Sequence, residues 1–248
     1  MTRMTANRRH PEGVRSLGRI TRAYLARRYT FLFYSLLLTL GAGPLIAAVG
    51  GDPAVIFWFL GVNLVAAVLG VEARPRWRPL LVSAVVFFVL ARLVAVALDS
   101  PRLIVTSLVL WVVIAVLAAA QALRFAMRAR RIDAEHVYAA LSAYLLAGVF
   151  CGVLYRVIES AWPGSFATAG TTTTFSIQNA IYFSFVTLAT LGYGDIVPQS
   201  EVARGIAVVE AIAGQLYLAV LVARLINTSR RPIGRAPAAS SARKGTGS

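Results

Sequence analysis

Charged residues are scarce in this chain, and their scarcity excludes an ordinary soluble domain. Only 14% of the 248 residues are Asp, Glu, Lys or Arg, whereas 58% are hydrophobic. Soluble domains carry about 25% charged residues, and the mean hydropathy here is +0.71. We therefore expect an all-α membrane protein whose apolar surface faces lipid.

Cysteine and histidine are almost absent, which excludes several kinds of site. Cys151 is the single cysteine, and His10 and His136 are the only histidines, so neither an internal disulfide nor a Cys/His metal site is expected. The sequence also lacks the Gly-x-Ser-x-Gly and His-Glu-x-x-His patterns of hydrolases. No oriented nucleophile or base can be assigned. We expect no enzymatic activity, no catalytic residue and no cofactor.

Acidic residues are few, with 10 against 25 basic residues and a net charge of +15. Such a balance is compatible with nucleic-acid binding. The arginines, however, form clusters between long apolar runs and not a surface interleaved with aromatic residues. We therefore attribute them to membrane topology and to anionic lipid, and expect no nucleic-acid partner.

Long apolar runs are abundant, and each approaches the roughly 20 residues that a helix needs to cross the hydrocarbon core. Short links join the first four runs, which predicts a compact four-helix bundle over residues 30–123. After a linker at 124–136, residues 137–228 contain two further runs and a short apolar helix between them. The expected spans are 30–49, 54–71, 79–98, 103–123, 136–158 and 202–227, and the short helix covers 177–188.

Basic residues concentrate in alternate links, which predicts the orientation of the chain. Segment 1–29 carries eight arginines, whereas the links at 51–54 and 99–102 contain only Arg102. By the positive-inside rule both termini are cytoplasmic. Segment 1–29 is either an interfacial helix on anionic lipid or a solvated basic tail. The tail 229–248 is expected to be disordered.

One stretch, residues 187–195 (Thr-Leu-Ala-Thr-Leu-Gly-Tyr-Gly-Asp), lies between the short helix and the last span. Gly192 and Gly194 alternate with Leu191 and Tyr193, so this backbone can reach positive φ values at every second residue. Successive carbonyl groups can then turn to one side. A ring of inward carbonyls is what replaces the water shell of a dehydrated cation.

Residues 190–195 resemble the selectivity filter of tetrameric potassium channels, which usually reads Thr-Val-Gly-Tyr-Gly-Asp. The resemblance covers residues 137–227 and points to the six-transmembrane bacterial type with a single pore loop. Leu191 is the one departure from the usual filter. The resemblance implies a homotetramer, because one chain supplies only one segment of the ring.

The resemblance also implies roles for individual residues. K⁺, as permeant ion, would bind the carbonyls of Thr190, Leu191, Gly192 and Tyr193, with Gly194 completing the filter. Filter support is assigned to Asp195, Tyr182, Thr187 and Glu210, although Val186 stands where some relatives carry a glutamate that pairs with the filter aspartate. Gly214 matches an inner-helix hinge, and the predicted cavity lining is Gln215, Ala219 and Val222.

Two residues allow more than one interpretation. Glu210 is either a protonatable group that tunes gating or a neutral or hydrogen-bonded anchor, because buried carboxyls in membranes usually face protein. Gly214 is either a hinge or a small residue that permits close helix packing. Asp133 is expected to cap the fifth span, with Glu135 and His136 as ordinary polar residues of its first turn.

The fourth run carries no charged residue between Arg102 and Arg124. The first four helices therefore resemble a voltage-sensor domain in number but lack gating arginines, so steep voltage dependence is not expected. We predict a potassium-selective channel in a cell membrane, of a kind that suits a bacterial plasma membrane. A weakly selective cation channel and a non-conducting scaffold with a pore-like fold are the alternatives.

Overall fold

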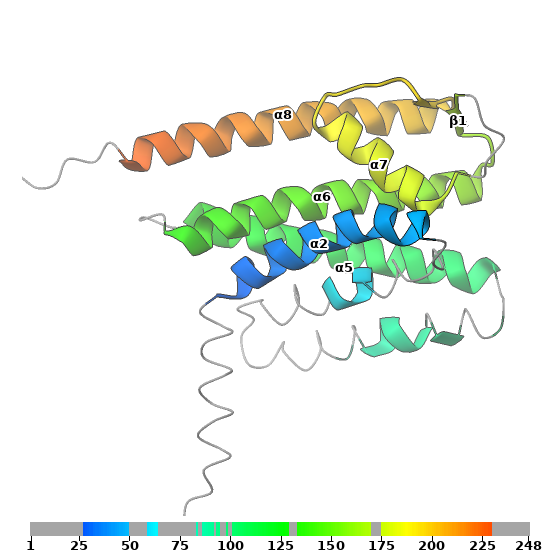
Figure 1. The fold of residues 1–248 in the computed structure, drawn as a ribbon, viewed down its shortest axis with the longest axis horizontal. Helices are drawn as coiled ribbons and strands as arrows, with labels where there is room; N and C mark the ends of the chain where they lie inside the picture. The colour runs from blue at the N-terminus through cyan, green and yellow to red at the C-terminus, as the bar shows by residue number, and fades with distance from the viewer. Residues whose placement is uncertain are drawn as a thin grey trace, which may run out of the picture.

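The computed structural model describes residues 27–49, 59–63, 83, 86–91, 93–94, 98, 101–128, 133–169 and 175–229. Residues 1–26 and 230–248 and most of the expected second and third spans lie outside the described residues, so the predictions about them stay predictions. The described elements are helices α2 (Arg28–Ala48), α5 (Pro101–Arg128), α6 (Ala134–Ala161), α7 (Ile177–Leu188) and α8 (Glu201–Ser229), and strands β1 (Phe166–Thr168) and β2 (Ile196–Pro198) (Figure 1).

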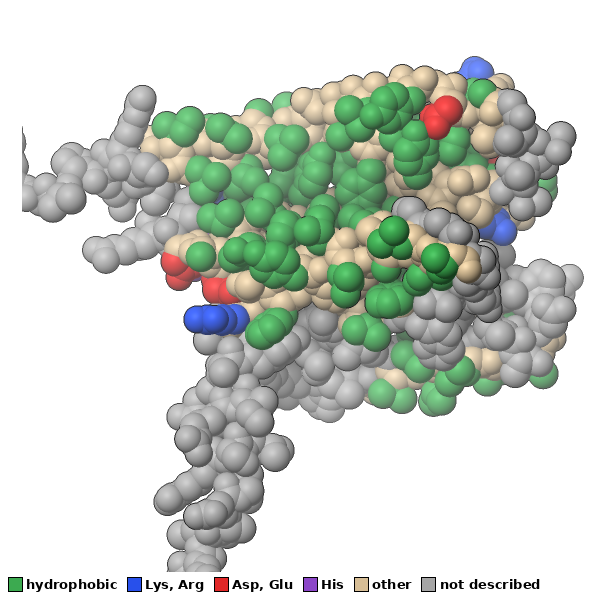
Figure 2. All heavy atoms as spheres, in the orientation of Figure 1, with side chains coloured by type: hydrophobic (Ala, Val, Ile, Leu, Met, Phe, Trp, Pro, Cys, Tyr) green, Lys and Arg blue, Asp and Glu red, His purple; other side chains and the backbone are tan. Residues whose placement is uncertain are grey.

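Three helices of the described ranges are long and apolar enough to cross a membrane, namely Thr106–Arg128, Ala134–Ala161 and Glu201–Asn227. Hydrophobic side chains cover much of the face formed by α2, α6 and α8, and the charged side chains in this view gather toward its two ends (Figure 2). The structure is thus that of a helical membrane protein. The number of spans, six, stays a prediction.

The main packing contact joins α5 to α6, which run side by side because only a few residues separate Arg128 from Ala134. Buried side chains fill this contact. They are Leu108, Trp111 and Ala115 of α5, Val149 and Val153 of α6, and Ile177 and Ile181 of α7. The helix that was expected to resemble a voltage-sensing element therefore packs on α6 of its own chain.

Helix α7 lies obliquely between α6 and α8 (Figure 1), and its bounds coincide with those expected from the sequence. The Ser176 side chain caps its start by accepting from the Asn179 amide at 3.2 Å. Two glycines of α6 admit it closely. A Cβ at Gly152 would lie 2.6 Å from the Cα of Ile181, and one at Gly148 would lie 2.6 Å from the ring of Phe185.

Strands β1 and β2 form a small antiparallel pair in which Thr168 pairs with Ile196. The pair lies at the end of the bundle where α6 ends and α8 begins, which we call the sheet end (Figure 1). Beneath it Phe166 stacks on Phe175 and meets Tyr155 and Phe183 edge-on. This strand pair was not expected from the sequence. It joins the segment that follows α6 to the segment that precedes α8.

Candidate functional site

Residues 189–195 connect α7 to β2 and carry an alternating backbone. Positive φ values occur at Thr190 (56°), Gly192 (58°) and Gly194 (78°), whereas Leu191 and Tyr193 have negative φ. Alternation of this kind turns successive carbonyl groups toward one side of the strand. The sequence predicted positive φ at the two glycines; the same conformation at Thr190, which costs a residue with a Cβ some strain, was not predicted.

The amides and the carbonyl oxygens of residues 190–193 differ in their hydrogen bonding. The amides of Thr190 and Leu191 donate back to the end of α7, to Thr187 O at 3.0 Å and to Val186 O at 2.8 Å. Across the described part of the chain, no backbone hydrogen bond reaches the carbonyl oxygens of residues 190–193. The segment is also exposed, with 57% of Leu191 and 67% of Tyr193 accessible. Its acceptors are therefore available to another species.

Asp195 fixes the sheet end of this segment. Its Oδ2 accepts from the hydroxyl of Tyr182 at 2.8 Å, and its Oδ1 accepts from the amide of Ile196 at 3.0 Å. Its carbonyl oxygen accepts from the amide of Ala169 at 2.8 Å. The expected proximity of Tyr182 and Asp195 is present. These bonds tie the segment to α7 and to β1.

The opposite end of the segment lies against α8. The Thr190 hydroxyl donates to the Ala189 carbonyl at 2.7 Å, and Gln215 Nε2 donates to Thr190 Oγ1 at 3.4 Å. Gln215, Ala219 and Val222 are exposed and follow one another at helical spacing on α8. The structure thus places this face of α8 next to Thr190. That it lines a cavity stays a prediction.

Gly214 packs against the end of α7. A Cβ at this position would lie 2.6 Å from the carbonyl oxygen of Leu188, so only glycine allows the two helices to approach this closely. Two tyrosines connect these helices to α6: Tyr144 Oη of α6 lies 3.5 Å from Leu188 O of α7, and Tyr217 Oη of α8 donates to Ala140 O of α6 at 2.6 Å. This geometry supports the close-packing interpretation of Gly214. The hinge stays a prediction.

Glu210 lies behind α7 and is only 4% exposed. Its Oε2 accepts from the hydroxyl of Tyr155 at 2.6 Å, and its Oε1 lies 2.5 Å from Ser184 Oγ. Of the two interpretations that the sequence allowed, these bonds favour the hydrogen-bonded anchor. Neither Ser184 nor Tyr155 was singled out from the sequence, because both look like ordinary residues of apolar helices.

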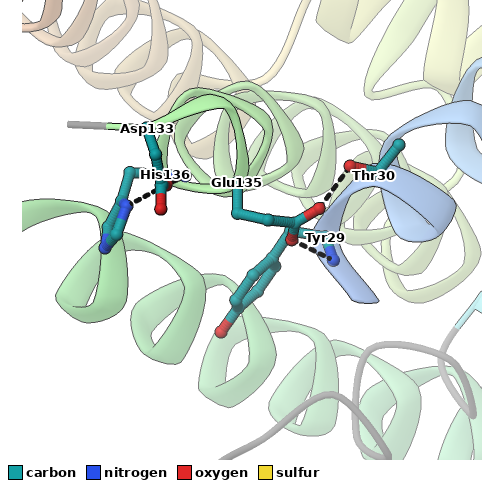
Figure 3. Close-up of polar contacts among 5 residues, drawn as sticks. All are labelled: Tyr29, Thr30, Asp133, Glu135 and His136. Carbon is teal, nitrogen blue, oxygen red and sulfur yellow. Dashed lines mark hydrogen bonds and ion pairs between the residues drawn. The ribbon is translucent and has the colours of Figure 1, made fainter. Parts of the chain in front are cut away.

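A second polar cluster lies at the end of the bundle where α2 and α6 begin (Figure 3). The Glu135 carboxylate accepts from the Tyr29 amide at 3.2 Å and from the Thr30 hydroxyl, and so caps the first turn of α2. Glu135 lies in the first turn of α6 as predicted, and this capping role is an addition that was not predicted. The sequence contains little sign of this contact, because Glu135 and Tyr29 are 106 residues apart.

Asp133 and His136 complete this cluster. Asp133 caps α6 as predicted, because its Oδ1 accepts from the His136 amide at 3.2 Å. It also bonds the His136 ring, and this side-chain hydrogen bond lowers the pKa of the Asp133 carboxyl. The His136 ring in turn stacks on Phe125 of α5, with centroids 4.5 Å apart. His136 is thus a packing residue as well, which the sequence did not indicate.

Part of the chain is similar to known proteins. Residues 140–231, less than half of the chain, match a protein-family model described as an ion channel. No solved structure gives a significant match. The matched residues include α7, the 189–195 segment and α8, and so coincide with the site.

Two curated relatives are each similar to a little over a third of the chain. An inward rectifier potassium channel of Paramagnetospirillum magnetotacticum is 36% identical over 36% of this chain and 25% of its own length. A two pore potassium channel of Oryza sativa subsp. japonica is 32% identical over 37% of this chain and 18% of its own length. The chain thus spans a quarter or less of these relatives. Together with the apolar helices, these similarities support an ion channel.

Proposed function

We propose that this chain is one subunit of a homotetrameric, potassium-selective channel, with residues 190–194 as its filter. The observation that carries the proposal is the alternating backbone of this segment, whose carbonyl oxygens receive no backbone hydrogen bond from the described residues. In a ring of four such strands the oxygens would surround a dehydrated cation. K⁺ would bind the carbonyls of Thr190, Leu191, Gly192 and Tyr193, with the Thr190 hydroxyl at the inner end.

Assembly with further copies is supported by what a single chain leaves uncovered. Irregular backbone at membrane depth is tolerated only where protein buries it or where it lines water. The exposed 190–194 segment meets this condition only if other copies enclose it. Helix α8 supports the same conclusion, since only 11% of its apolar window is buried against the chain, compared with 50% for α6. We propose that copies of α8 pack around the axis below the filter.

Selectivity for K⁺ is supported by the similarity of part of the chain to two potassium channels. The Leu191 side chain is exposed in the single subunit and is available to pack against a neighbouring copy. Asp195 and Tyr182 would brace the filter from behind. A weakly selective cation channel is the alternative, because Leu191 is larger than the valine usual at this position.

The remaining parts of the proposal concern the membrane. Both termini would lie in the cytoplasm of a cell, with anionic lipid at the basic segments. No charged residue lies between Arg102 and Arg124 on α5, so conduction would not depend steeply on voltage. Gly214 would add a hinge to its packing role, and Gln215, Ala219 and Val222 would line an aqueous cavity.

The test is ion flux from proteoliposomes under a K⁺ or a Na⁺ gradient. We expect K⁺ flux that exceeds Na⁺ flux and is blocked by Ba²⁺. Gly192→Ala is expected to lose it, because a Cβ is strained at φ 58°. The matched variant Gly205→Ala, on α8 with nothing within 4 Å of the added Cβ, is expected to keep it. Equal flux of both ions would favour the weakly selective channel, and no K⁺ flux under any condition would favour the scaffold.

A further inference from the structure

Three helices meet at one buried carboxyl group, that of Glu210 on α8. Tyr155 of α6 and Ser184 of α7 are 0% exposed, and both reach the two carboxyl oxygens. The Ser184 hydroxyl also lies 2.6 Å from the carbonyl oxygen of Gly148 on α6. The four groups form a continuous chain of polar contacts from Tyr155 through Glu210 and Ser184 to Gly148.

The number of protons shared among these four groups determines whether the Glu210 carboxyl is ionised or protonated. Tyr155 supplies one proton, to Glu210 Oε2. A serine hydroxyl has one proton and a carbonyl oxygen has none. Ser184 Oγ nevertheless contacts two acceptors, Gly148 O at 2.6 Å and Glu210 Oε1 at 2.5 Å. An ionised Glu210 would leave one of these contacts between two oxygens with no hydrogen between them.

A proton on Glu210 satisfies the contacts among Tyr155, Glu210, Ser184 and Gly148. Glu210 Oε1 then donates to Ser184 Oγ, Ser184 donates to Gly148 O, and Tyr155 donates to Glu210 Oε2. The surroundings agree, because an unpaired charge in an apolar interior is costly. The titratable groups near the carboxyl are Tyr155, the thiol of Cys151 on α6 and, further away, Tyr144. Among the described side chains no cation pairs with Glu210.

We propose that Glu210 is held as the neutral acid, and that as a hydrogen-bond donor to Ser184 it is the positioning residue of α7. Ser184 lies on the same short helix as Val186 and Thr187, whose carbonyl oxygens accept from the amides of Leu191 and Thr190. The bond from Glu210 therefore fixes the helix from which the 190–194 segment starts. Its effect on ion selection rests on the function proposed above; the protonation state does not.

Infrared spectroscopy of the full-length protein in lipid tests the protonation state without any conduction. We expect a carbonyl-stretch band of a protonated carboxylic acid at neutral pH, absent from Glu210→Gln and retained in Glu201→Gln, whose carboxylate on the same helix is exposed. In Ser184→Ala the band should remain and move to higher frequency, because its hydrogen-bond acceptor is gone. A wild-type spectrum without the band, or a band unchanged in both Glu210→Gln and Ser184→Ala, would overturn the proposal.

Flux ratios test the positioning role. A glutamine amide can donate to Ser184 while its carbonyl accepts from Tyr155, whereas leucine does neither. We therefore expect Glu210→Leu to lower the ratio of K⁺ to Na⁺ flux, and Glu210→Gln to keep the ratio of the parent protein. A ratio as low in Glu210→Gln as in Glu210→Leu would contradict a donor role. If the parent protein itself carried no flux, the channel proposal would fail and the infrared result would stand alone.

Discussion

The hydroxyl of Tyr182 donates a hydrogen bond of 2.8 Å to the carboxylate of Asp195, across the 13 residues that include the end of α7 and the whole 190–194 segment. This bond joins the two ends of residues 182–195. Its two ends are held independently, since Tyr182 belongs to α7 and the Asp195 carbonyl pairs with Ala169 beside β1. The segment between them is thereby kept extended although its own carbonyl groups make no backbone hydrogen bonds within the described chain.

Tyr182→Phe removes this bond without changing the ring. We expect the ratio of K⁺ to Na⁺ flux to fall by about tenfold, the factor that corresponds to the loss of a hydrogen bond to a charged group. Paired flux measurements in proteoliposomes check this. Tyr34→Phe is the matched control, because among the described residues the Tyr34 hydroxyl bonds to that of Tyr138 alone, at 3.4 Å on the surface of α2 and α6. Similar ratios in both variants would show that the bond to Asp195 does not support the filter.

Gly214→Ala is expected to lower the stability of the fold by about 1–3 kcal/mol, the usual cost of overpacking. The cause is the new Cβ, which would lie 2.6 Å from the Leu188 carbonyl oxygen. Gly205→Ala on the same helix has free space around its Cβ, and should raise stability by roughly 0.5–1 kcal/mol because glycine weakens helix interiors. Unfolding midpoints in detergent would compare the two. A Gly214→Ala protein as stable as Gly205→Ala would contradict the close contact of α7 and α8.

Glu135→Ala is expected to lower the stability of the first turn of α2 by about 1 kcal/mol, the usual cost of losing a helix cap. The Tyr29 amide and the Thr30 hydroxyl would lose their acceptor. Hydrogen exchange at residues 29–31 should then be faster. Thr30→Val, which lacks a hydroxyl, should show a smaller increase, whereas Thr30→Ser should resemble the parent protein. Unchanged exchange in Glu135→Ala would remove the capping role.

The Asp133 carboxyl provides a prediction about pH. Its hydrogen bond with the His136 side chain lowers its pKa below the ordinary value of 3.8. A lowered pKa means that the bond stabilises the folded state at pH values above 3.8, and that this contribution is lost as the pH falls through the lower folded pKa. Carbon chemical shifts of the labelled carboxyl would report the value. His136→Phe should move the pKa back toward 3.8, and a parent pKa at or above 3.8 would refute the coupling.

Features that depend on residues close together in the sequence could be predicted. The bounds of α7, the course of α6 and α8, and the positive φ values of Gly192 and Gly194 all follow from local apolar length and from glycine spacing. The bond between Tyr182 and Asp195 could also be anticipated, because the motif brings the two residues to one end of the segment.

Contacts between distant residues could not be predicted. Tyr155 and Glu210 are 55 residues apart, and Glu135 meets Tyr29 across 106 residues. A serine or tyrosine in an apolar helix carries no local sign of such a partner, since the contact depends on how the helices cross. The pairing of β1 with β2 is similar, because three-residue strands leave no periodic pattern.

A reversal potential would measure directly whether four copies of residues 190–194 select K⁺. The purified protein would be placed in a planar bilayer with K⁺ on one side and Na⁺ at equal concentration on the other. We expect a current that reverses far from zero, in the direction set by K⁺, and that is absent from Gly192→Ala. A current that reverses at zero would contradict selectivity for K⁺.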